Sequence, residues 1–244
     1  MNGILCRQLA LDYCCAPEEL LSRGNVFTEY RPLEGRRRFQ EQKECFLKIA
    51  AVNGKLLFTG RADIVDRCRR EFADSGPEWF FEADTLRLLD ARIREEGWQI
   101  AMAHPFFLPA EAREARTEGA EIRWYERDGI EAFRGDSRYR EAFSFCAEAP
   151  DVLGVAALRK GEIVGMAGAS ADSPTMWQIG INVDPACRGE GVATMLVTLL
   201  KNEILKRWIL PFYGTSMSHI ASQRTALAAG FLPAWAELVT EKTE

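Results

Sequence analysis

Residues 183–208 read VDPACRGEGVATMLVTLLKNEILKRW. The stretch leaves the end of an apolar segment, passes Pro185 and a tight turn with Gly189 and Gly191, and continues as an amphipathic helix. Glycine lets a backbone approach a ligand closely, and the first N–H groups of a helix have no acceptor within the helix. The stretch therefore predicts a strand, a turn and a helix that together hold a phosphate group, and a pyrophosphate fits best.

Two other phosphate-binding motifs do not fit this turn. A Walker A loop requires Gly-Lys-Ser or Gly-Lys-Thr before its helix, and the chain contains no such tripeptide. A dinucleotide fingerprint requires a third small residue where Thr194 stands. That fingerprint also opens a βαβ unit, whereas this turn follows a predicted antiparallel hairpin late in the chain. Both alternatives are therefore rejected.

The segments on either side of the turn alternate between predicted strands and helices. The expected elements are a strand over residues 122–130, a helix over 136–147, strands over 152–158, 163–169 and 176–183, and, beyond the long helix, a strand over 208–215 and a helix over 219–229. The turn residues at 159–161 join two of these strands into an antiparallel hairpin.

Several short motifs occur in order along residues 120–244. They are GMAG at 165–168, INVDP at 181–185, RGEGVA at 188–193, and a last helix with Ser222, Gly230 and Phe231. The third fits the Q/R-x-x-G-x-G/A pyrophosphate loop of the GNAT acyltransferase superfamily, and in this combination the sequence resembles that superfamily. The resemblance implies an α+β fold with a mostly antiparallel central sheet flanked by helices. It also implies acetyl-CoA as co-substrate, without a metal.

The resemblance implies a role for each part of the site. Backbone groups of the strand before the loop are expected to bind pantetheine, and the loop amides are expected to bind the pyrophosphate. The backbone amide of Val183 is expected to stabilise the oxyanion of the tetrahedral intermediate. The implied cofactor-binding residues are Ile181, Asn182, Val183, Arg188, Gly189, Glu190, Gly191, Val192, Ala193, Thr194 and Ser222.

Two positions depart from the family pattern. Ala226 stands where a tyrosine often protonates the leaving thiolate, and His219 stands where an asparagine is usual. The candidate proton donors are therefore Tyr213, Ser222 and His219, beside solvent. We expect a GNAT-type N-acetyltransferase that passes the acetyl group to a primary amine by direct attack. A non-catalytic protein that senses acyl-CoA is the alternative.

A general base for the amine is harder to find in the sequence. Asp184, Asp172 and Glu131 are conceivable bases, but each is more typical of a surface or turn carboxylate. Cys187 lies beside the loop without a recognisable activating partner, so it is interpreted as a structural thiol.

The first half of the chain is interpreted as a smaller mixed α/β domain. Its clearest signal is Asn53-Gly54 between two apolar runs, which predicts a hairpin within residues 45–60. The other expected elements are helices over 6–15, 63–73 and 84–96 and extended segments over 25–30 and 98–107. A charged connector at 109–119 gives domain limits of 1–117 and 118–244. The hairpin and helix at 45–73 also suggest a degenerate second copy of the fold.

Composition limits the classes of partner. The 244 residues carry a formal net charge of -5, which disfavours sequence-independent binding of nucleic acid. Seven cysteines without C-x-x-C spacing fit reduced thiols, and two histidines are too few for a His-rich metal site. Without a basic leader or a long apolar run, we expect a cytoplasmic protein with no membrane partner. The expected acceptor is a small-molecule or peptide amine, and an oligomer is compatible with the sequence.

Overall fold

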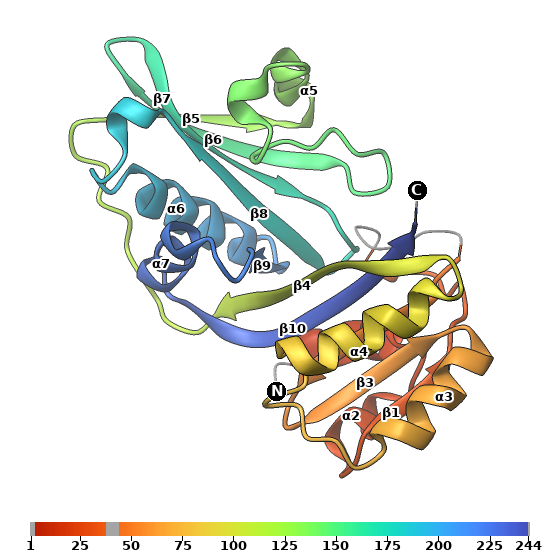
Figure 1. Cartoon of the computed structure of the whole chain (residues 1–244). Coiled ribbons are helices and arrows are strands. Elements are labelled where there is room, and N and C mark those ends of the chain that lie inside the picture. The colour runs from red at the N-terminus through yellow and green to blue at the C-terminus, as the bar shows by residue number, and fades with distance from the viewer. Residues whose placement is uncertain (1–2, 38–43, 244) are drawn as a thin grey trace. The chain divides into compact units, whose positions relative to one another are not determined.

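The computed structural model describes residues 3–37 and 44–243. Its helices (Figure 1) are α1 (Gly3–Asp12), α2 (Pro17–Leu21), α3 (Ala62–Phe72), α4 (Ala83–Arg94), α5 (Arg127–Ile130), α6 (Val192–Lys206) and α7 (Ile220–Ala228), with 3-10 turns η2 (Glu131–Phe133), η3 (Ser137–Tyr139) and η4 (Pro185–Cys187). Its strands are β1 (Val26–Glu29), β2 (Leu47–Val52), β3 (Lys55–Gly60), β4 (Trp98–Pro109), β5 (Glu121–Glu126), β6 (Asp151–Arg159), β7 (Glu162–Ser170), β8 (Met176–Val183), β9 (Leu210–Gly214) and β10 (Phe231–Lys242).

Within the described residues these ten strands belong to one mixed sheet, in the order β1-β3-β2-β10-β4-β9-β8-β7-β6-β5. The predicted α+β class is therefore confirmed, whereas a separate N-terminal domain is not shown. The chain divides into two compact units, unit 1 (Met1–Phe106 with Ala234–Glu244) and unit 2 (Phe107–Pro233). The domain limits 1–117 and 118–244 stay a prediction. No helix in the described part of the chain has the length and apolar character needed to cross a bilayer.

Unit 2 contains most of the elements expected around the glycine turn, but the strand expected over residues 122–130 ends at Glu126 and the chain continues as α5. Strands β5 to β8 are antiparallel neighbours, and β9 runs parallel to β8. Alternate strand residues pack on opposite faces, so Val155 and Ala167 share a core with α6 and α7 while Ala156 and Met166 pack with α5 and the turns after it. Figure 1 shows these strands running between α5 and the pair α6 and α7. We call the two sides the α5 face and the α6–α7 face.

A row of three glycines crosses the α5 face. Gly154, Gly168 and Gly180 are paired neighbours on β6, β7 and β8. A Cβ atom on Gly180 would lie 1.7 Å from the carbonyl oxygen of Glu141, and one on Gly168 would lie 2.0 Å from that of Ala142. Because these positions lack side chains, the backbone of the Glu141–Ala142 dipeptide lies directly against the sheet.

The helix predicted over residues 136–147 is wrong. Only the single turn η3 forms there. Asn182 Oδ1 accepts hydrogen bonds from the N–H groups of Glu141 (3.0 Å) and Ala142 (2.8 Å). Further along, the buried Asp151 carboxylate accepts two more backbone N–H groups. These side chains take up amides that a helix would bond internally, so the segment follows the sheet surface instead.

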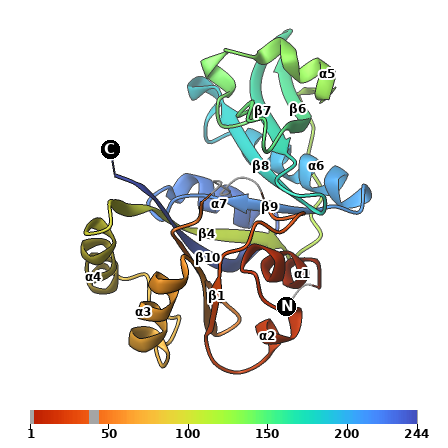
Figure 2. The ribbon, with the colours of Figure 1, turned by 90° about the vertical axis from the view of Figure 1, so that its right-hand side faces the viewer.

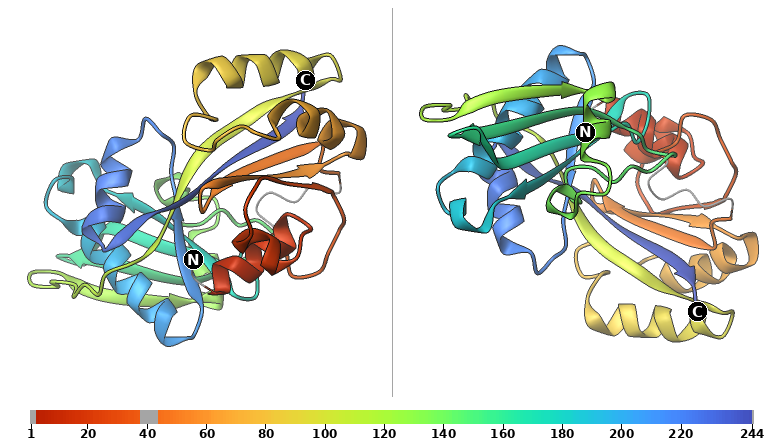
Figure 3. Two further views of the ribbon diagram at one scale, coloured as in Figure 1. Left: turned by 90° about the horizontal axis from the view of Figure 1, so that it is seen from below. Right: turned by 90° about the horizontal axis from the view of Figure 1, so that it is seen from above.

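Unit 1 confirms the hairpin around Asn53-Gly54. Both residues have positive φ, 50° and 72°, as the two central residues of a type I′ turn require. Figures 2 and 3 show α3 and α4 on one side of the unit 1 strands and α1 and α2 on the other. The second-copy hypothesis is rejected: in unit 2 the hairpin strand β7 pairs next with β8, which is antiparallel and follows the hairpin, whereas in unit 1 the hairpin strand β3 pairs with β1, which is parallel and precedes the hairpin.

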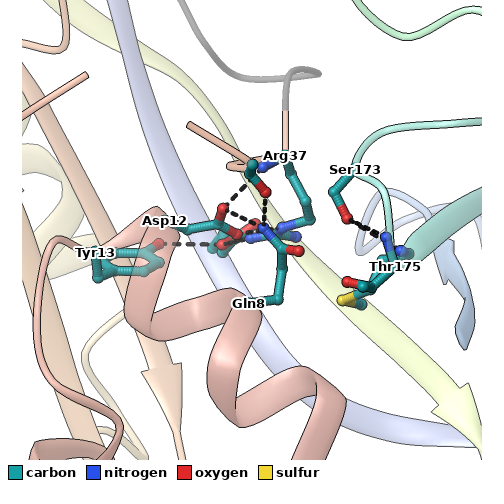
Figure 4. A network of polar contacts seen from close by, with 9 residues as sticks. Gln8, Asp12, Tyr13, Arg37, Ser173 and Thr175 are labelled. Atoms are coloured by element: carbon teal, nitrogen blue, oxygen red, sulfur yellow. Dashed lines mark hydrogen bonds and ion pairs between the residues drawn. The ribbon is translucent and has the colours of Figure 1, made fainter. Parts of the chain in front are cut away.

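A buried polar network lies inside unit 1 (Figure 4). The Arg37 guanidinium forms ion pairs with the carboxylates of Asp12 and Glu237, and all three side chains are at most 6% exposed. Tyr13 donates its hydroxyl hydrogen to Glu237, and Gln8 donates to Asp12 (3.0 Å). One guanidinium thus neutralises two buried carboxylates that are contributed by α1 and β10. Burial and the neighbouring Glu237 raise the pKa of the Tyr13 phenol well above its ordinary value of 10.0.

Candidate functional site

The glycine turn presents backbone N–H groups at the start of α6. Gly189 and Gly191 have φ of 81° and 83°, a region that side chains disfavour, and no atom lies within 4 Å of where their Cβ atoms would be. The helix begins at Val192, and Gly191, its N-cap, brings no capping side chain. The first turn-closing bond runs from Met195 N to Gly191 O (3.0 Å), so the amides before Met195 have no acceptor within the helix. The turn is exposed and open, as a phosphate site requires.

Contacts on both sides fix the turn. Asp184 Oδ1 accepts from Ala186 N (2.8 Å) and caps η4, which Pro185 opens. A Cβ atom on Gly165 would lie 2.7 Å from Val192 Cγ1, so this glycine lets the first turn of α6 pack closely on β7. These contacts set the direction in which the loop amides point.

Charge in the loop favours an anion. Glu190, the carboxylate of the loop, forms an ion pair with Arg159 at the end of β6. The Arg188 side chain is exposed beside the two glycines. Because Glu190 is paired, the Arg188 guanidinium and the positive end of the α6 dipole remain to attract a diphosphate.

The strand before the turn separates from its neighbour. Pairing of β8 with β9 ends at Ile179 opposite Tyr213, although β8 continues to Val183. Asp184 N donates to Val164 O on β7, and in an antiparallel ladder alternate residues bond to the same neighbour. The backbone groups of Ile181 and Val183 therefore point away from β7, toward the side where β9 has ended. This edge has the form that an added extended chain requires, and the Val183 N–H points to the same side.

Asn182 has a different arrangement from its two neighbours. The same alternation directs its backbone groups toward β7, where it pairs with Met166. Its side-chain oxygen is occupied by the amides of Glu141 and Ala142. The role of Asn182 in binding the cofactor stays a prediction. In the structure its side chain holds the Glu141 backbone on the α5 face.

Two of the predicted proton donors lie together. The hydroxyl groups of Tyr213 and Ser222 are hydrogen-bonded at 2.8 Å. Tyr213 is buried at 2% exposure, whereas Ser222 is half-buried on α7. Burial raises the pKa of the Tyr213 phenol, the bond to Ser222 lowers it, and the negative charge of Glu141 raises it further. The phenol therefore keeps its proton at neutral pH.

The third candidate lies at the start of α7, three residues before Ser222. His219 is the exposed N-cap residue of α7, and its carbonyl oxygen accepts from Gln223 N (3.1 Å). Ala226, where the family often has tyrosine, is fully buried in the core that also contains Tyr213. Tyr213 on β9 thus brings a phenol hydroxyl to Ser222 on α7, although position 226 on that helix carries no hydroxyl group.

The carboxylates considered as bases have structural partners. Asp172 is fully buried and accepts from the Ser170 hydroxyl (2.6 Å), Asp184 caps η4, and Glu131 pairs with Arg134. Cys187 is half-buried, and all seven cysteines are free. In the described ranges no group of three or more His, Cys, Asp or Glu side chains is arranged to hold a metal.

Sequence reasoning missed Glu141. It lies in the segment that was predicted as helix, so its position against β8 could not be anticipated. A signal did exist in the sequence, because Gly154, Gly168 and Gly180 recur in three neighbouring strands. Glycine inside a strand often marks a place where another backbone approaches closely.

Residues 118–231 match the model of the acetyltransferase (GNAT) family. No curated protein sequence matches the chain.

Solved structures with a similar course of the chain include several acetyltransferases. A GCN5-related N-acetyltransferase-like protein from Streptococcus suis is 14% identical, with 96% of this chain and 98% of that one covered and a TM-score of 0.48. An acetyltransferase of the GNAT family from Novosphingobium aromaticivorans is 15% identical. The match covers 61% of this chain and 69% of that one, with a TM-score of 0.43. An aminoglycoside N-acetyltransferase in complex with CoA is 21% identical. The match covers 51% of this chain and 93% of that one, with a TM-score of 0.37.

Proposed function

We propose, from the premise that residues 118–231 are an acetyltransferase domain of the GNAT family, that this protein transfers an acetyl group from acetyl-CoA to a primary amine. The observation that carries the proposal is the combination of an open glycine turn at the start of α6 and the unpaired edge of β8 leading to it. The glycine turn suits a diphosphate, and the edge of β8 suits an extended chain with amide groups. Coenzyme A contains a diphosphate followed by such a chain, the pantetheine.

The two parts divide the binding of acetyl-CoA between them. The loop amides of residues 189–194 and the Arg188 guanidinium bind the pyrophosphate. The backbone of Ile181 and Val183 binds the pantetheine as an added strand would. This places the thioester beside the point where β8 and β9 separate, next to Tyr213 and Ser222.

The residues at that point suit a direct attack. The lone pair of the neutral amine forms the new C–N bond, and the N–H of Val183 stabilises the negative oxygen. When the C–S bond breaks, the thiolate takes a proton from the Ser222 hydroxyl, which recovers one from Tyr213 through their 2.8 Å hydrogen bond. Tyr213 is reprotonated from water. Of the three candidate donors, this hydrogen-bonded pair has the geometry that fits best.

The alternative function, a sensor of acyl-CoA without turnover, rests on Ala226. A methyl group at this position cannot donate a proton. The Tyr213–Ser222 pair supplies hydroxyl groups in the same core, which is why catalysis is the better proposal.

The test begins with the affinity for acetyl-CoA, measured by calorimetry. The double variant Arg188→Glu with Gly191→Asp places charge and bulk against the pyrophosphate, so affinity should fall at least a hundredfold. Arg116→Glu with Gly119→Asp is the matched control, because both residues are exposed, Gly119 also has positive φ (81°), and its Cβ position is open. The control should bind as the wild type does. Equal affinity in a folded double variant would refute the site.

Thiol release from acetyl-CoA on a panel of amines then separates enzyme from sensor. Turnover with a primary amine supports the transferase. Tight binding of acetyl-CoA without turnover on any amine of the panel would favour the sensor.

A further inference from the structure

An exposed glutamate, Glu141, has its backbone fixed on the α5 face beside the end of the β8–β9 pairing. The backbone of Glu141 rests against Gly180, where a Cβ atom would be 1.7 Å from its carbonyl oxygen. Its N–H donates to Asn182 Oδ1 at 3.0 Å. Both contacts are to β8, the strand proposed to bind pantetheine. The position of this residue is therefore tied to the strand that would hold the thioester.

The faces of the sheet place Glu141 opposite the proton donors. Along β8, Gly180 faces the α5 side, whereas Ile179 packs in the α6–α7 core together with Tyr213. Pairing of β8 with β9 ends at these two residues, so the strands separate between Glu141 and the phenol. The negative charge of Glu141 raises the pKa of the Tyr213 phenol, as a carboxylate near this end of β8 would.

The carboxylate is accessible to a ligand. Its side chain is 65% exposed, and its partner is the 77% exposed Arg140, with Nε 3.3 Å from Glu141 Oε1. Ion pairs this exposed contribute little, so a cationic ligand can replace Arg140 at small cost. Other carboxylates near the turn are committed elsewhere, Asp184 to the η4 cap and Glu190 to Arg159.

We propose that Glu141 binds the ammonium group of the acceptor on the α5 face and takes up the proton that the nitrogen must lose before attack. The inference rests on the proposed function and assigns it a substrate class, amines that arrive as alkylammonium ions. The N–H bond breaks toward the Glu141 carboxylate, and the freed lone pair forms the C–N bond. That proton then passes to water. The nitrogen of the tetrahedral intermediate loses its second proton to water, and the departing thiolate is protonated from the opposite face. One ammonium ion and one thioester thus give one amide, one thiol and one proton.

The experiment compares Glu141→Gln with wild type in binding and in turnover. The probes are spermidine, kanamycin and a lysine-containing peptide, titrated by calorimetry in the presence of CoA. At least one cation should bind wild type about tenfold to a hundredfold more tightly than Glu141→Gln, because one charge-assisted contact is lost. Its kcat/KM should fall at least as far, and Glu141→Asp should recover part of both.

Glu121→Gln is the matched control, because it removes the same charge from an exposed glutamate whose partner is Arg123. It should leave both quantities within about twofold of wild type. If none of the three cations binds wild type more tightly than Glu141→Gln, the assignment of Glu141 is overturned. Affinity for CoA alone is read in the same titrations, so loss of the proposed function itself would be recognised separately.

Discussion

Replacing Gly180 with alanine should detach the Glu141 segment from the sheet. The new Cβ atom would lie 1.7 Å from the Glu141 carbonyl oxygen and 2.8 Å from its carbon, both of which are backbone atoms. Optimal contact between such atoms is about 3.5 Å, so the overlap is close to 2 Å. A flexible side chain could swing aside, but here the segment itself must move.

The cost can be worked out from what that movement breaks. Overpacking by one methyl group typically costs about 1–3 kcal/mol. Displacing the segment also breaks the two hydrogen bonds to Asn182 Oδ1, each worth about 1 kcal/mol. The sum is near 3–5 kcal/mol, and at about 2–4 °C per kcal/mol the melting temperature should fall by roughly 6–20 °C.

Calorimetry and kinetics together measure both consequences. Acetyl-CoA affinity should stay within about threefold of wild type, because the loop and the free edge of β8 are untouched. The kcat/KM for the amine should drop at least tenfold, since Glu141 is displaced. Gly129→Ala on α5 is the control: its Cβ atom would meet Tyr125 Cδ1 at 3.5 Å, an ordinary contact, so neither quantity should fall.

The reasoning fails if Gly180→Ala melts within about 1 °C of wild type and acetylates the amine equally fast. That result would mean the Glu141 segment does not rest on β8.

Two further changes test other parts of the chain. Tyr213→Phe keeps the ring but removes the hydroxyl bonded to Ser222, so kcat should fall about a hundredfold with unchanged acetyl-CoA affinity. Burial raises the pKa of this phenol, so the phenol keeps its proton as the pH rises, and its ionisation should not lower wild-type kcat below pH 10. A decline of kcat near pH 8 that Tyr213→Phe abolishes would contradict the assignment. In unit 1, Arg37→Met leaves the buried carboxylates of Asp12 and Glu237 without their cation and should cost about 3–5 kcal/mol in urea unfolding, whereas a loss below 1 kcal/mol would show that the network contributes little.

The hydroxyl group of Tyr213 illustrates how one chemical group can come from different elements. The family places it on the last helix, and here position 226 is a fully buried alanine. Tyr213 brings a hydroxyl group from β9 into the same core and shares a hydrogen bond with Ser222 on that helix. The proposed mechanism needs a hydroxyl group where β8 and β9 separate, and a residue of either element can supply it.

Local features of this protein followed from the sequence alone. The turn at Gly189 and Gly191, the hairpin at Asn53-Gly54 and the long helix α6 depend on residues that are close together in the chain. Positive φ at glycine or asparagine and helical periodicity are properties of such short stretches, so reading the sequence was sufficient.

Only the tertiary structure decided the conformation of residues 136–147 and the neighbours of Glu141. Asn182, some 40 residues further along the chain, accepts hydrogen bonds from the N–H groups of Glu141 and Ala142. Because Gly180 has no side chain, this backbone packs directly against β8. The pairing of Arg37 with Glu237, 200 residues apart, has the same origin. A local sequence pattern indicates which side chains prefer burial. The partner of a backbone amide or of a buried charge depends instead on which distant strand the fold places beside it.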